Sequence, residues 1–577
     1  EKMNYNFINK INGWVVFAIA TIVYLLTIED TASLWDCGEY ITAAYKLEVG
    51  HPPGAPLYMI LGRVFSFFAA PENVAYYINC LSALSSSFTI LFMYWSITLL
   101  LKKLILQGKN ELEKHDQIGI FVAATIGSLA YTFTDSFWFS AVEGEVYAMA
   151  SLFTAIIFWA ILKWDEEMAA LQANRLSSDV APNRWLLLIL FLLGLAIGVH
   201  LLGILVIPAI GYVIYFRVKE TTTSGFFIAG ILSIVILGFI QEGVIPGTIS
   251  MASSFEVAFV NSLGLPFYSG SLFFFALLIA ACVFGVHYAR KNNLTLLSNS
   301  LMGLVFLLIG YGSFAVIVIR SNANTPLDEN DPENLVTLHS YLKREQYGSS
   351  PILSGPSWNS KENPRADFED ISAYHLRRWV VVDNESNKDL KGFVNEKDAK
   401  KWAQKEFDNN LPENIVIEEK YFETNSSIRK NATPTYEQSR LFPRMYARSK
   451  RHIVGYKFWS GYDAEDGTDT ELGKDDKRLP SSSENIRYFV DYQLNWMYFR
   501  YFMWNFAGRQ NDFQGHGDNM RGNWISGFDF IDESRLGSQE FAPHYTSENK
   551  SNNKFYFIPL IFALIGLIYH YLKAPKD

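Results

Sequence analysis

Residues 185–216 read WLLLILFLLGLAIGVHLLGILVIPAIGYVIYF, a run of 32 residues without Asp, Glu, Lys or Arg. A membrane-spanning helix needs about 20 consecutive apolar residues. The run is therefore too long for a single span. We expect a break at Gly198-Val199-His200, which divides the run into two short helices that meet at one face of a membrane.

Apolar runs recur along the chain, and we interpret ten of them as candidate membrane spans. Their approximate bounds are residues 12–28, 74–101, 118–138, 145–163, 185–199, 200–216, 224–241, 271–289, 294–319 and 554–572. The sequence thus predicts a mainly α-helical, polytopic membrane protein with about ten transmembrane helices.

The composition agrees with a membrane protein. Half of the 577 residues are apolar and 19% are charged, whereas soluble globular chains carry about 25% charged residues. The net charge is −9, from 49 Lys and Arg against 58 Asp and Glu. These values disfavour a wholly soluble protein, a disordered chain and a basic protein that binds nucleic acid. Three cysteines are too few for a disulfide framework.

The Lys and Arg residues between the spans predict the orientation of the chain, because cytoplasmic loops carry an excess of them. Basic loops alternate with acidic loops along the sequence. The basic loops contain Lys102, Lys103, Lys109, Lys114, Lys163, Arg175, Arg184, Arg217, Lys219, Arg290 and Lys291. We expect these loops and the N-terminus in the cytoplasm, and the acidic loops on the opposite side.

Residues 320–553 differ from the rest of the chain because they are rich in Asn, Asp, Lys, Ser and Tyr. We predict a transmembrane catalytic core at residues 1–319, a mixed α/β extracytoplasmic domain at 320–553 and a last transmembrane helix at 554–577. Inside the extracytoplasmic domain the pattern predicts two strands and one polar helix, at Trp379–Asp383, Ile415–Glu418 and Glu396–Glu406.

The first outer loop carries two acidic residues and a proline turn. It reads Ser33-Leu-Trp-Asp-Cys-Gly-Glu-Tyr40, followed by His51-Pro-Pro-Gly-Ala-Pro-Leu-Tyr58. Asp36 and Glu39 are three residues apart and would share one face of a helix. Proline cannot continue a helix, so the turn at His51 leads into a second helix from Pro56 to Ala69. The alternative is an acidic loop with a tight turn and no further role.

A second acidic segment precedes the fourth span, on the same side of the membrane. It contains Asp135, Glu143 and Glu145, and His200 lies at the break between the fifth and sixth spans. Carboxylates near hydrocarbon are costly and tend to line a cavity or a site. The alternatives are ordinary acids at the membrane interface and, for His200, a histidine packed against a neighbouring helix.

Four arginines stand on the side that otherwise has few cations. Arg320 and Arg344 follow the ninth span, and Arg500 and Arg509 flank an aromatic segment, Tyr498–Asp512. A guanidinium can hold a phosphate with two parallel hydrogen bonds. We expect the aromatic segment to fold back onto the membrane surface, which brings its arginines near the acidic loops. A helix end at the interface explains Arg320 equally well, and a soluble core helix is the alternative for the aromatic segment.

The chain resembles the membrane-embedded GT-C glycosyltransferases, which take a sugar from a polyprenyl-phosphate carrier. More narrowly, residues 12–572 are similar to a protein O-mannosyltransferase-like family of bacterial envelope proteins with a vertebrate endoplasmic-reticulum relative. The motifs that carry the likeness are Trp35–Tyr40, His51–Pro56, Glu143–Glu145, Arg320…Asn330 and Arg500–Arg509. Bacterial relatives run on into further spans, and the chain begins with Glu1, so we expect a trimmed product.

The resemblance implies an inverting transfer of a hexose, with mannose favoured, from a polyprenyl-phosphate donor to Ser or Thr of exported proteins. Asp36 would be the catalytic base, with Glu39 or Glu145 holding the acceptor or the base. Fixed cations would stabilise the phosphate that leaves. The implied substrate-binding residues are His51, Glu143, His200, Arg320, Arg344, Arg500 and Arg509.

The resemblance also implies a place and partners. We expect a multi-pass protein of the bacterial inner membrane with its large domain in the periplasm. Its partners would be the lipid-linked sugar, secreted or envelope proteins, membrane lipid and the secretory translocon. Related oligosaccharyltransferases bind a divalent metal through Asp-x-Asp in the first loop, whereas this loop has Asp36-x-x-Glu39. We therefore expect no metal site and no required cofactor.

Three other functions remain open on the sequence. The same chemistry could act on a glycolipid or polysaccharide acceptor. A transporter could use Glu143, Glu145 and His200 as proton relays, although transporters usually show paired repeats and this chain shows no repeat. A non-catalytic scaffold could receive secreted chains at the membrane.

Overall fold

The computed structural model describes residues 4–107, 109, 111–173, 180–347, 350–364, 374–386, 388–424, 434–464, 473 and 477–574. The chain folds into two compact units. The first unit contains residues 1–256, 268–344 and 561–577, and the second contains residues 257–267 and 345–560. Each is described here by itself.

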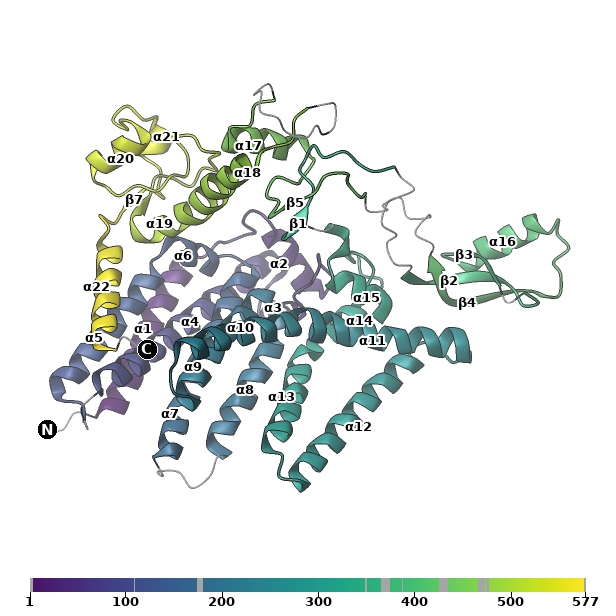
Figure 1. The fold of residues 1–577 in the computed structure, drawn as a ribbon, viewed down its shortest axis with the longest axis horizontal. Coiled ribbons are helices and arrows are strands. Elements are labelled where there is room, and N and C mark those ends of the chain that lie inside the picture. Colours follow the sequence, from purple (N-terminus) through teal and green to yellow (C-terminus); the bar gives the residue numbers. More distant parts are fainter. Residues whose placement is uncertain are drawn as a thin grey trace. The chain divides into compact units, whose positions relative to one another are not determined.

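The first unit is a bundle of helices (Figure 1). Its long helices are α1 (Tyr5–Leu26), α4 (Val74–Ile105), α5 (Lys114–Thr132), α7 (Val146–Gln172), α8 (Val180–Ile197), α9 (Ile207–Val218), α10 (Thr223–Gly238), α11 (Ile245–Val257), α12 (Ser269–Lys291) and α13 (Thr295–Tyr311). Shorter helices connect them: α2 (Cys37–Lys46), α3 (Pro56–Ser66), η1 (Pro71–Asn73), α6 (Asp135–Ala141), η2 (Leu201–Val206), η3 (Phe239–Val244), η5 (Gly312–Phe314), α14 (Ala315–Ser321) and α15 (Leu335–Leu342).

Seven helices of the described residues are long and apolar enough to cross a membrane. The bent pair α5 and α6, with an angle of 68° between its helices, makes eight if it is one span. Two shorter apolar helices, Pro182–Ile197 and Ile558–Lys573, occupy the remaining predicted spans. The prediction of a mainly helical, polytopic membrane protein is confirmed, with the number of spans approximate.

The predicted break after α8 is present. This helix ends at Ile197, and η2 begins at Leu201. His200 between them has an extended backbone, and its Nδ1 accepts a hydrogen bond from the backbone N–H of Leu202 at 3.1 Å. The imidazole thus satisfies a backbone donor that has no partner within the helix, which ends one helix and begins the next.

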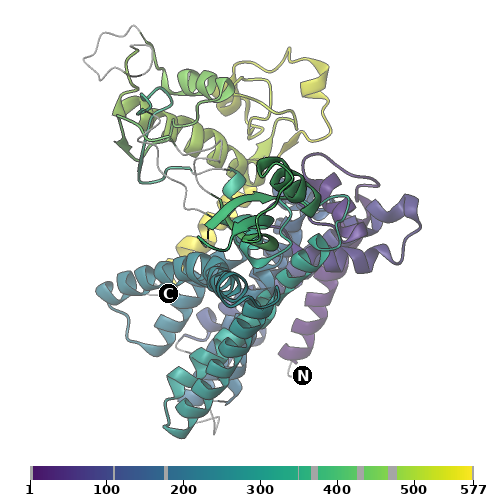
Figure 2. The ribbon, with the colours of Figure 1, turned by 90° about the vertical axis from the view of Figure 1, so that its right-hand side faces the viewer.

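The core of the first unit runs through the helices around α4 and α7. Its fully buried side chains include Tyr58 of α3, Ile78 of α4, and Ile157 and Ile161 of α7. A smaller cluster joins α1 to α4, α5 and α6, and in it the hydroxyl of Tyr24 donates to the carbonyl of Thr132 at 2.9 Å. Helices α12 and α13 contact each other, and both are teal in the two views (Figure 1 and Figure 2).

Ion pairs gather at one end of the bundle. Asp165 of α7 bonds Arg217 of α9 at 2.5 Å and Lys103 of α4 at 3.4 Å. Glu166 bonds Lys102 at 3.0 Å. Glu145 lies directly before α7, 20 residues earlier, and a helix rises about 1.5 Å per residue. The ion pairs and Glu145 are thus ~30 Å apart along α7, about the thickness of a hydrocarbon core.

This arrangement fits the predicted alternation of basic and acidic loops, because residues from three separate helices meet at the basic end. Which side of the membrane that end faces stays a prediction.

The second unit combines a small sheet with short helices. Its helices are η4 (Ala258–Ser262), η6 (Glu345–Tyr347), α16 (Glu396–Glu406), α17 (Lys450–Ser460), α18 (Ser482–Tyr488), η10 (Phe489–Phe499), α19 (Arg500–Phe506), α20 (Asp529–Leu536), α21 (His544–Ser547) and the start of α22 (Ile558–Lys573). Its strands are β1 (Ser354–Gly355), β2 (Tyr374–Asp383), β3 (Lys388–Phe393), β4 (Ile415–Thr424), β5 (Arg440–Leu441), β6 (Gly508–Arg509) and β7 (Asn553–Lys554).

The three longer strands form an antiparallel sheet in the order β3-β2-β4, covered by α16 (Figure 1). The predicted strands lie within β2 and β4, and α16 has the predicted bounds. Residues 320–344, which the sequence assigned to the extracytoplasmic domain, belong to the first unit. The backbone N–H of Val49 bonds the carbonyl of Leu327, and the hydroxyl of Tyr341 bonds the carbonyl of Gly50.

Two glycines set the distance between α8 and α13. A Cβ atom added to Gly194 would collide with the backbone carbonyl of Leu307, and one added to Gly310 would collide with the backbone of Phe191. Small residues let membrane helices approach closely.

We expect Gly194→Ala to lower the melting temperature of the purified protein in detergent, because the backbone of α13 cannot move aside as a side chain can. Overpacking of this kind costs about 1–3 kcal/mol. Gly119→Ala in α5 is the matched control, since a Cβ there meets open space. Equal melting temperatures for the two variants would contradict this account of the packing.

Candidate functional site

The first outer loop is tied to the second acidic segment. The side-chain amide of Asn79, fully buried in α4, donates to the carbonyls of Glu29 at 2.6 Å and Thr31 at 3.0 Å. The hydroxyl of Ser33 donates to Oε2 of Glu143 at 2.6 Å. These bonds hold the segment before Asp36 against the loop that carries Glu143, although the two are about a hundred residues apart in sequence.

Asp36 stands at the start of α2, where the loop turns into the helix. Its side chain is exposed and makes no capping hydrogen bond with α2. Its negative charge nevertheless raises the pKa of Glu145, after burial and Glu143, and the pKa of His51, after Glu39. Asp36 therefore lies close to both residues while its carboxylate remains open to solvent.

Glu39 and His51 form a pair across the proline turn. Oε1 of Glu39 accepts hydrogen bonds from the backbone N–H of His51 at 2.7 Å and from its Nδ1 at 2.9 Å. Gly50 leaves room for this carboxylate, because an added Cβ would lie 2.6 Å from Oε1 of Glu39 and would displace it. The turn closes where the N–H of Gly54 donates to the carbonyl of His51 at 2.9 Å.

The pair changes the proton affinity of both partners. The hydrogen bond from His51 lowers the pKa of Glu39, and the bond to Glu39 raises the pKa of His51. Both shifts favour the charged forms. The Nε2 atom of His51 faces the hydroxyl of Tyr40 at 3.5 Å. His51 thus adds a positive charge beside Asp36.

Glu143 and Glu145 are both buried, with 5% and 9% of their surface exposed. Burial raises the pKa of Glu143. Burial, followed by the negative charges of Glu143 and Asp36, raises the pKa of Glu145 to about 7, while His51 opposes the shift. Gly144 between them fits against α4 and α2, since an added Cβ would lie 2.7 Å from Oδ1 of Asn79 in α4 and 2.9 Å from Ile41 in α2.

His200 brings the break after α8 into the same neighbourhood. Its ring lies 5.3 Å from that of Tyr147, in the first turn of α7. Burial, with the positive charges of Arg344 and His51, lowers the pKa of His200. His200 is therefore held neutral, and Arg344 lies close enough to influence it.

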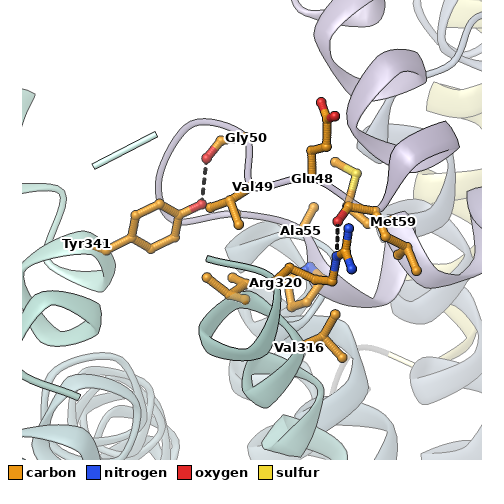
Figure 3. A pocket seen from close by; sticks show the side chains of 12 residues that line it. Glu48, Val49, Gly50, Ala55, Met59, Val316, Arg320 and Tyr341 are labelled. Atoms are coloured by element: carbon orange, nitrogen blue, oxygen red, sulfur yellow. Dashed lines mark hydrogen bonds between the residues drawn. The ribbon is translucent and has the colours of Figure 1, made fainter. Parts of the chain in front are cut away.

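Arg320 uses its donors on the backbone. Its Nε donates to the carbonyl of Leu47 at 2.6 Å, and Nη2 reaches the carbonyl of Lys46 at 3.3 Å. These carbonyls end α2, where a cation is favourable. The small pocket beside them (Figure 3) has a volume of about 20 Å³, room for about one water molecule. Arg320 thus stabilises the end of α2 and the turn that follows it.

The two arginines of the aromatic segment lie in the second unit, and each has local contacts there. Arg500 is buried, stacks over Trp496 at 4.1 Å and donates to the carbonyl of Gly522 at 2.8 Å. Arg509 stacks over Trp504 at 4.3 Å. These contacts hold the loop after α19 on the helix, so they account for both guanidinium groups within their own unit.

The site of the first unit therefore contains Asp36, Glu39, His51, Glu143, Glu145, His200 and Arg344. Sequence reasoning missed Ser33, Asn79 and Tyr147. A buried Asn in an apolar helix is costly unless it has a partner, so Asn79 was the available signal. Among the described residues no group of three His, Cys, Asp or Glu side chains could hold a metal ion; the absence of a required metal stays a prediction.

We expect Glu39→Gln to return the pKa of His51 towards its ordinary value, because the bond to the carboxylate raises it. The measurement is a titration of the His51 ring by NMR with ¹³C-labelled histidine. Glu48→Gln, which leaves the Glu39–His51 pair intact, is the matched control. A titration of His51 unchanged by the substitution would contradict the pairing.

The same pair makes stability depend on pH. The stabilisation from His51, whose pKa is raised, is present below its ordinary pKa and is lost as the pH rises through the raised value. The stabilisation from Glu39, whose pKa is lowered, is lost as the pH falls through the lowered value. The difference in melting temperature between wild type and Glu39→Gln should be largest between about pH 4.3 and pH 6.5.

Comparison with known families places this site inside a matched segment. Residues 36–224 match the family model described as the N-terminal domain of protein O-mannosyl-transferase TMEM260. This segment is therefore similar to the protein O-mannosyltransferase-like family. It contains every residue of the site except Arg344, which follows later in the chain. Residues 382–490 match a family of unknown function, DUF8416.

Two curated relatives of this family are eukaryotic. The protein O-mannosyl-transferase tmem260 of Dictyostelium discoideum is 28% identical over 148 residues, which are 25% of this chain and 16% of the relative. The mouse protein O-mannosyl-transferase TMEM260 is 26% identical over 163 residues, 28% of this chain and 21% of the relative. The matches thus span about a fifth of the relatives' length. No solved structure matches the chain.

The resemblance to a protein O-mannosyltransferase-like family with a eukaryotic relative is therefore confirmed. The likeness to bacterial envelope proteins stays a prediction.

Proposed function

We propose that this chain is a membrane glycosyltransferase that moves a hexose, mannose in the first instance, from a polyprenyl-phosphate carrier to Ser or Thr of proteins. The observation that carries the proposal is the convergence of Asp36, Glu145 and the Glu39–His51 pair within the family segment. Both curated relatives bear the name protein O-mannosyl-transferase, which supports the sugar and the acceptor class.

Asp36 is the proposed base. Its carboxylate is exposed at the start of α2, so a substrate hydroxyl can reach it. In the transfer, Asp36 takes the hydroxyl proton while the oxygen bonds to the anomeric carbon. The bond from that carbon to the phosphate oxygen breaks, and its electron pair leaves with the lipid phosphate. A single displacement of this kind inverts the anomeric configuration.

The surrounding residues have different tasks because their environments differ. Glu145 has a pKa of about 7 through burial and its acidic neighbours, so near neutral pH its protonated form can donate a hydrogen bond to the acceptor or to the sugar. His51 and Arg344 supply positive charge, which favours the ionised base and the developing phosphate. Arg320 acts indirectly, by holding the end of α2.

The proposed site faces the exterior of the cytoplasmic membrane. Glu145 and the basic ion pairs lie ~30 Å apart along α7, and basic loops favour the cytoplasm. The acidic end would then face the periplasm in a bacterial cell, where lipid-linked donors and exported protein acceptors meet. The secretory translocon is the neighbour from which unfolded acceptors would come.

We expect Asp36→Asn to lower the rate of sugar transfer by about 10²–10⁴-fold, the usual contribution of a positioned base. The measurement is the sugar mass added to exported proteins in cells, and to an acceptor peptide by the purified enzyme. Asp30→Asn is the matched control, because Asp30 is exposed in the same loop. Identical glycosylation in cells with either variant would contradict the assignment of Asp36. It would favour a non-catalytic scaffold instead.

The donor is tested separately. With purified protein in nanodiscs, we expect transfer from a polyprenyl-phosphate mannose and none from GDP-mannose. The proposed site lies at the membrane face and uses a donor that its lipid keeps in the bilayer, whereas GDP-mannose is soluble. The product linkage should have the anomeric configuration opposite to that of the donor. Transfer from the soluble nucleotide sugar, or retention of configuration, would contradict the proposed mechanism. Transfer to a glycolipid but to no peptide would assign the acceptor to the alternative class.

A further inference from the structure

One face of the second unit is apolar and exposed. Along η10 and α19 six large side chains are exposed, and five of them follow the spacing of a single helix face, whereas Phe499 does not. The five are Val490, Leu494, Met497, Tyr498 and Tyr501, with 39% to 62% of their surface exposed. We call these five residues the apolar stripe.

The opposite face of the same helices provides the packing of the unit. Tyr488 and Tyr492 stack at 5.1 Å, and the ring of Trp459 lies 5.4 Å from Tyr492 and 5.6 Å from Trp496. The helices are therefore fixed in the unit by one side. The apolar stripe lies on the other side and keeps a large part of its apolar surface exposed, although the ring of Tyr501 also contacts that of Trp504 at 4.4 Å.

A second aromatic group stands at the start of α22. The ring of Phe528 lies 5.4 Å from that of Tyr556 and 6.3 Å from that of Phe557. Phe530 is 77% exposed and its ring lies 6.0 Å from Phe528. Tyr556 and Phe557 immediately precede Ile558, where α22 begins, and Phe528 contacts both of them. We call Phe528, Phe530, Tyr556 and Phe557 the aromatic group.

Ring stacking along α19 and one backbone hydrogen bond connect the apolar stripe to the aromatic group. Tyr498 stacks on Phe502, and Phe502 stacks on Phe506 at 4.5 Å, so aromatic rings follow α19 to its end. There the backbone N–H of Phe555 donates to the carbonyl of Ala507 at 2.7 Å. The two surfaces are thus connected through one short segment of backbone.

The length of α22 restricts where the aromatic group can lie. The helix has 16 residues, and none of them is buried. At about 1.5 Å per residue it is ~24 Å long, less than the ~30 Å of a hydrocarbon core. If α22 crosses the bilayer, the residues at its start must lie in the interface, where aromatic side chains and Lys are favoured. Lys554 is exposed two residues before Tyr556.

We propose that the apolar stripe and the aromatic group together form a membrane-docking surface, held in the headgroup region of the bilayer that α22 enters. A second point of attachment supports lipid over a protein partner. Asn261, in η4 at the end of the long apolar helix Thr223–Ser262, bonds the backbone of Tyr421 in β4 at 2.6 Å and 3.0 Å. The second unit is thus continuous with apolar helices at both of its ends.

The test uses the full chain in nanodiscs of phosphatidylethanolamine with a minor part of phosphatidylglycerol. The photoreactive residue p-benzoylphenylalanine replaces one residue at a time: Tyr498→p-benzoylphenylalanine in the apolar stripe and Phe530→p-benzoylphenylalanine in the aromatic group. Phe562, exposed in α22, is the positive reference, and Lys405, exposed on the polar helix α16, is the control. After illumination, mass spectrometry measures the fraction of chain that carries a lipid adduct.

We expect lipid adducts at positions 498 and 530 in a fraction close to that at 562, and several-fold less at 405. All four side chains are exposed, and at positions 498 and 530 the substituted residue keeps an aromatic ring in place of the one it replaces. Adducts to a second copy of the chain or to another protein would overturn the proposal. So would the absence of lipid adducts at positions 498 and 530 when position 562 gives them. Neither result bears on the transfer of sugar.

Discussion

The acidic site depends on burying carboxylates beside a bundle that offers them almost no water. Glu143 and Glu145 are nearly inaccessible, and an ionised carboxylate without partners costs several kcal/mol in such surroundings. The chain meets this cost by bringing the first outer loop onto the second, where Ser33 donates to Glu143. Asn79 holds that loop from within α4 by two bonds to its backbone. The position of Asp36 follows from this clamp, because the loop has only a few residues between Ser33 and α2.

The same surroundings divide the acids into two kinds. Asp36 is exposed to water, and the hydrogen bond from His51 lowers the pKa of Glu39, which favours its charged form. Burial, followed by the charges of Glu143 and Asp36, raises the pKa of Glu145 to about 7. Pairs of titratable groups whose environments separate their proton affinities are a common feature of catalytic sites. The site thus combines an acceptor of protons and a donor of hydrogen bonds within one short stretch of structure.

Much of the fold could be predicted from the sequence, because a bilayer leaves few choices. Long apolar runs must become helices, and the break at His200 followed from a run that was too long. The strand at 379–383 and the helix at 396–406 followed from simple periodicity. The site was less accessible. The loops containing Asp36 and Glu145 were linked only by their shared side of the membrane, and the bond from Ser33 to Glu143 has no sequence pattern.

For Arg320 the sequence left two roles open, a phosphate ligand and a cation at a helix end, and the first stays a prediction. Its position after the ninth span suggested a phosphate ligand, but the structure gives its donors to the carbonyls that end α2. The sequence around Arg344 is no more distinctive than that around Arg320, yet it is the charge of Arg344 that contributes to lowering the pKa of His200. The arginines at 500 and 509 stack on tryptophans of their own unit. A guanidinium suits a phosphate, a backbone carbonyl or an indole ring equally well, and only tertiary structure selects among them.

Helix α7 has a consequence for the kind of bilayer the protein suits. The acids stand at its first turn and the ion pairs lie 20 residues later, so the stretch of helix between them is ~30 Å long. A helix whose apolar stretch is longer than the bilayer is thick tilts. In a bilayer that is too thick, the lipid thins locally or the flanking side chains extend towards the interface. A tilt of α7 would lower Glu145 towards the acyl chains and change its hydration. The thickness of the membrane thus affects the hydration of Glu145, although this residue lies outside the hydrocarbon.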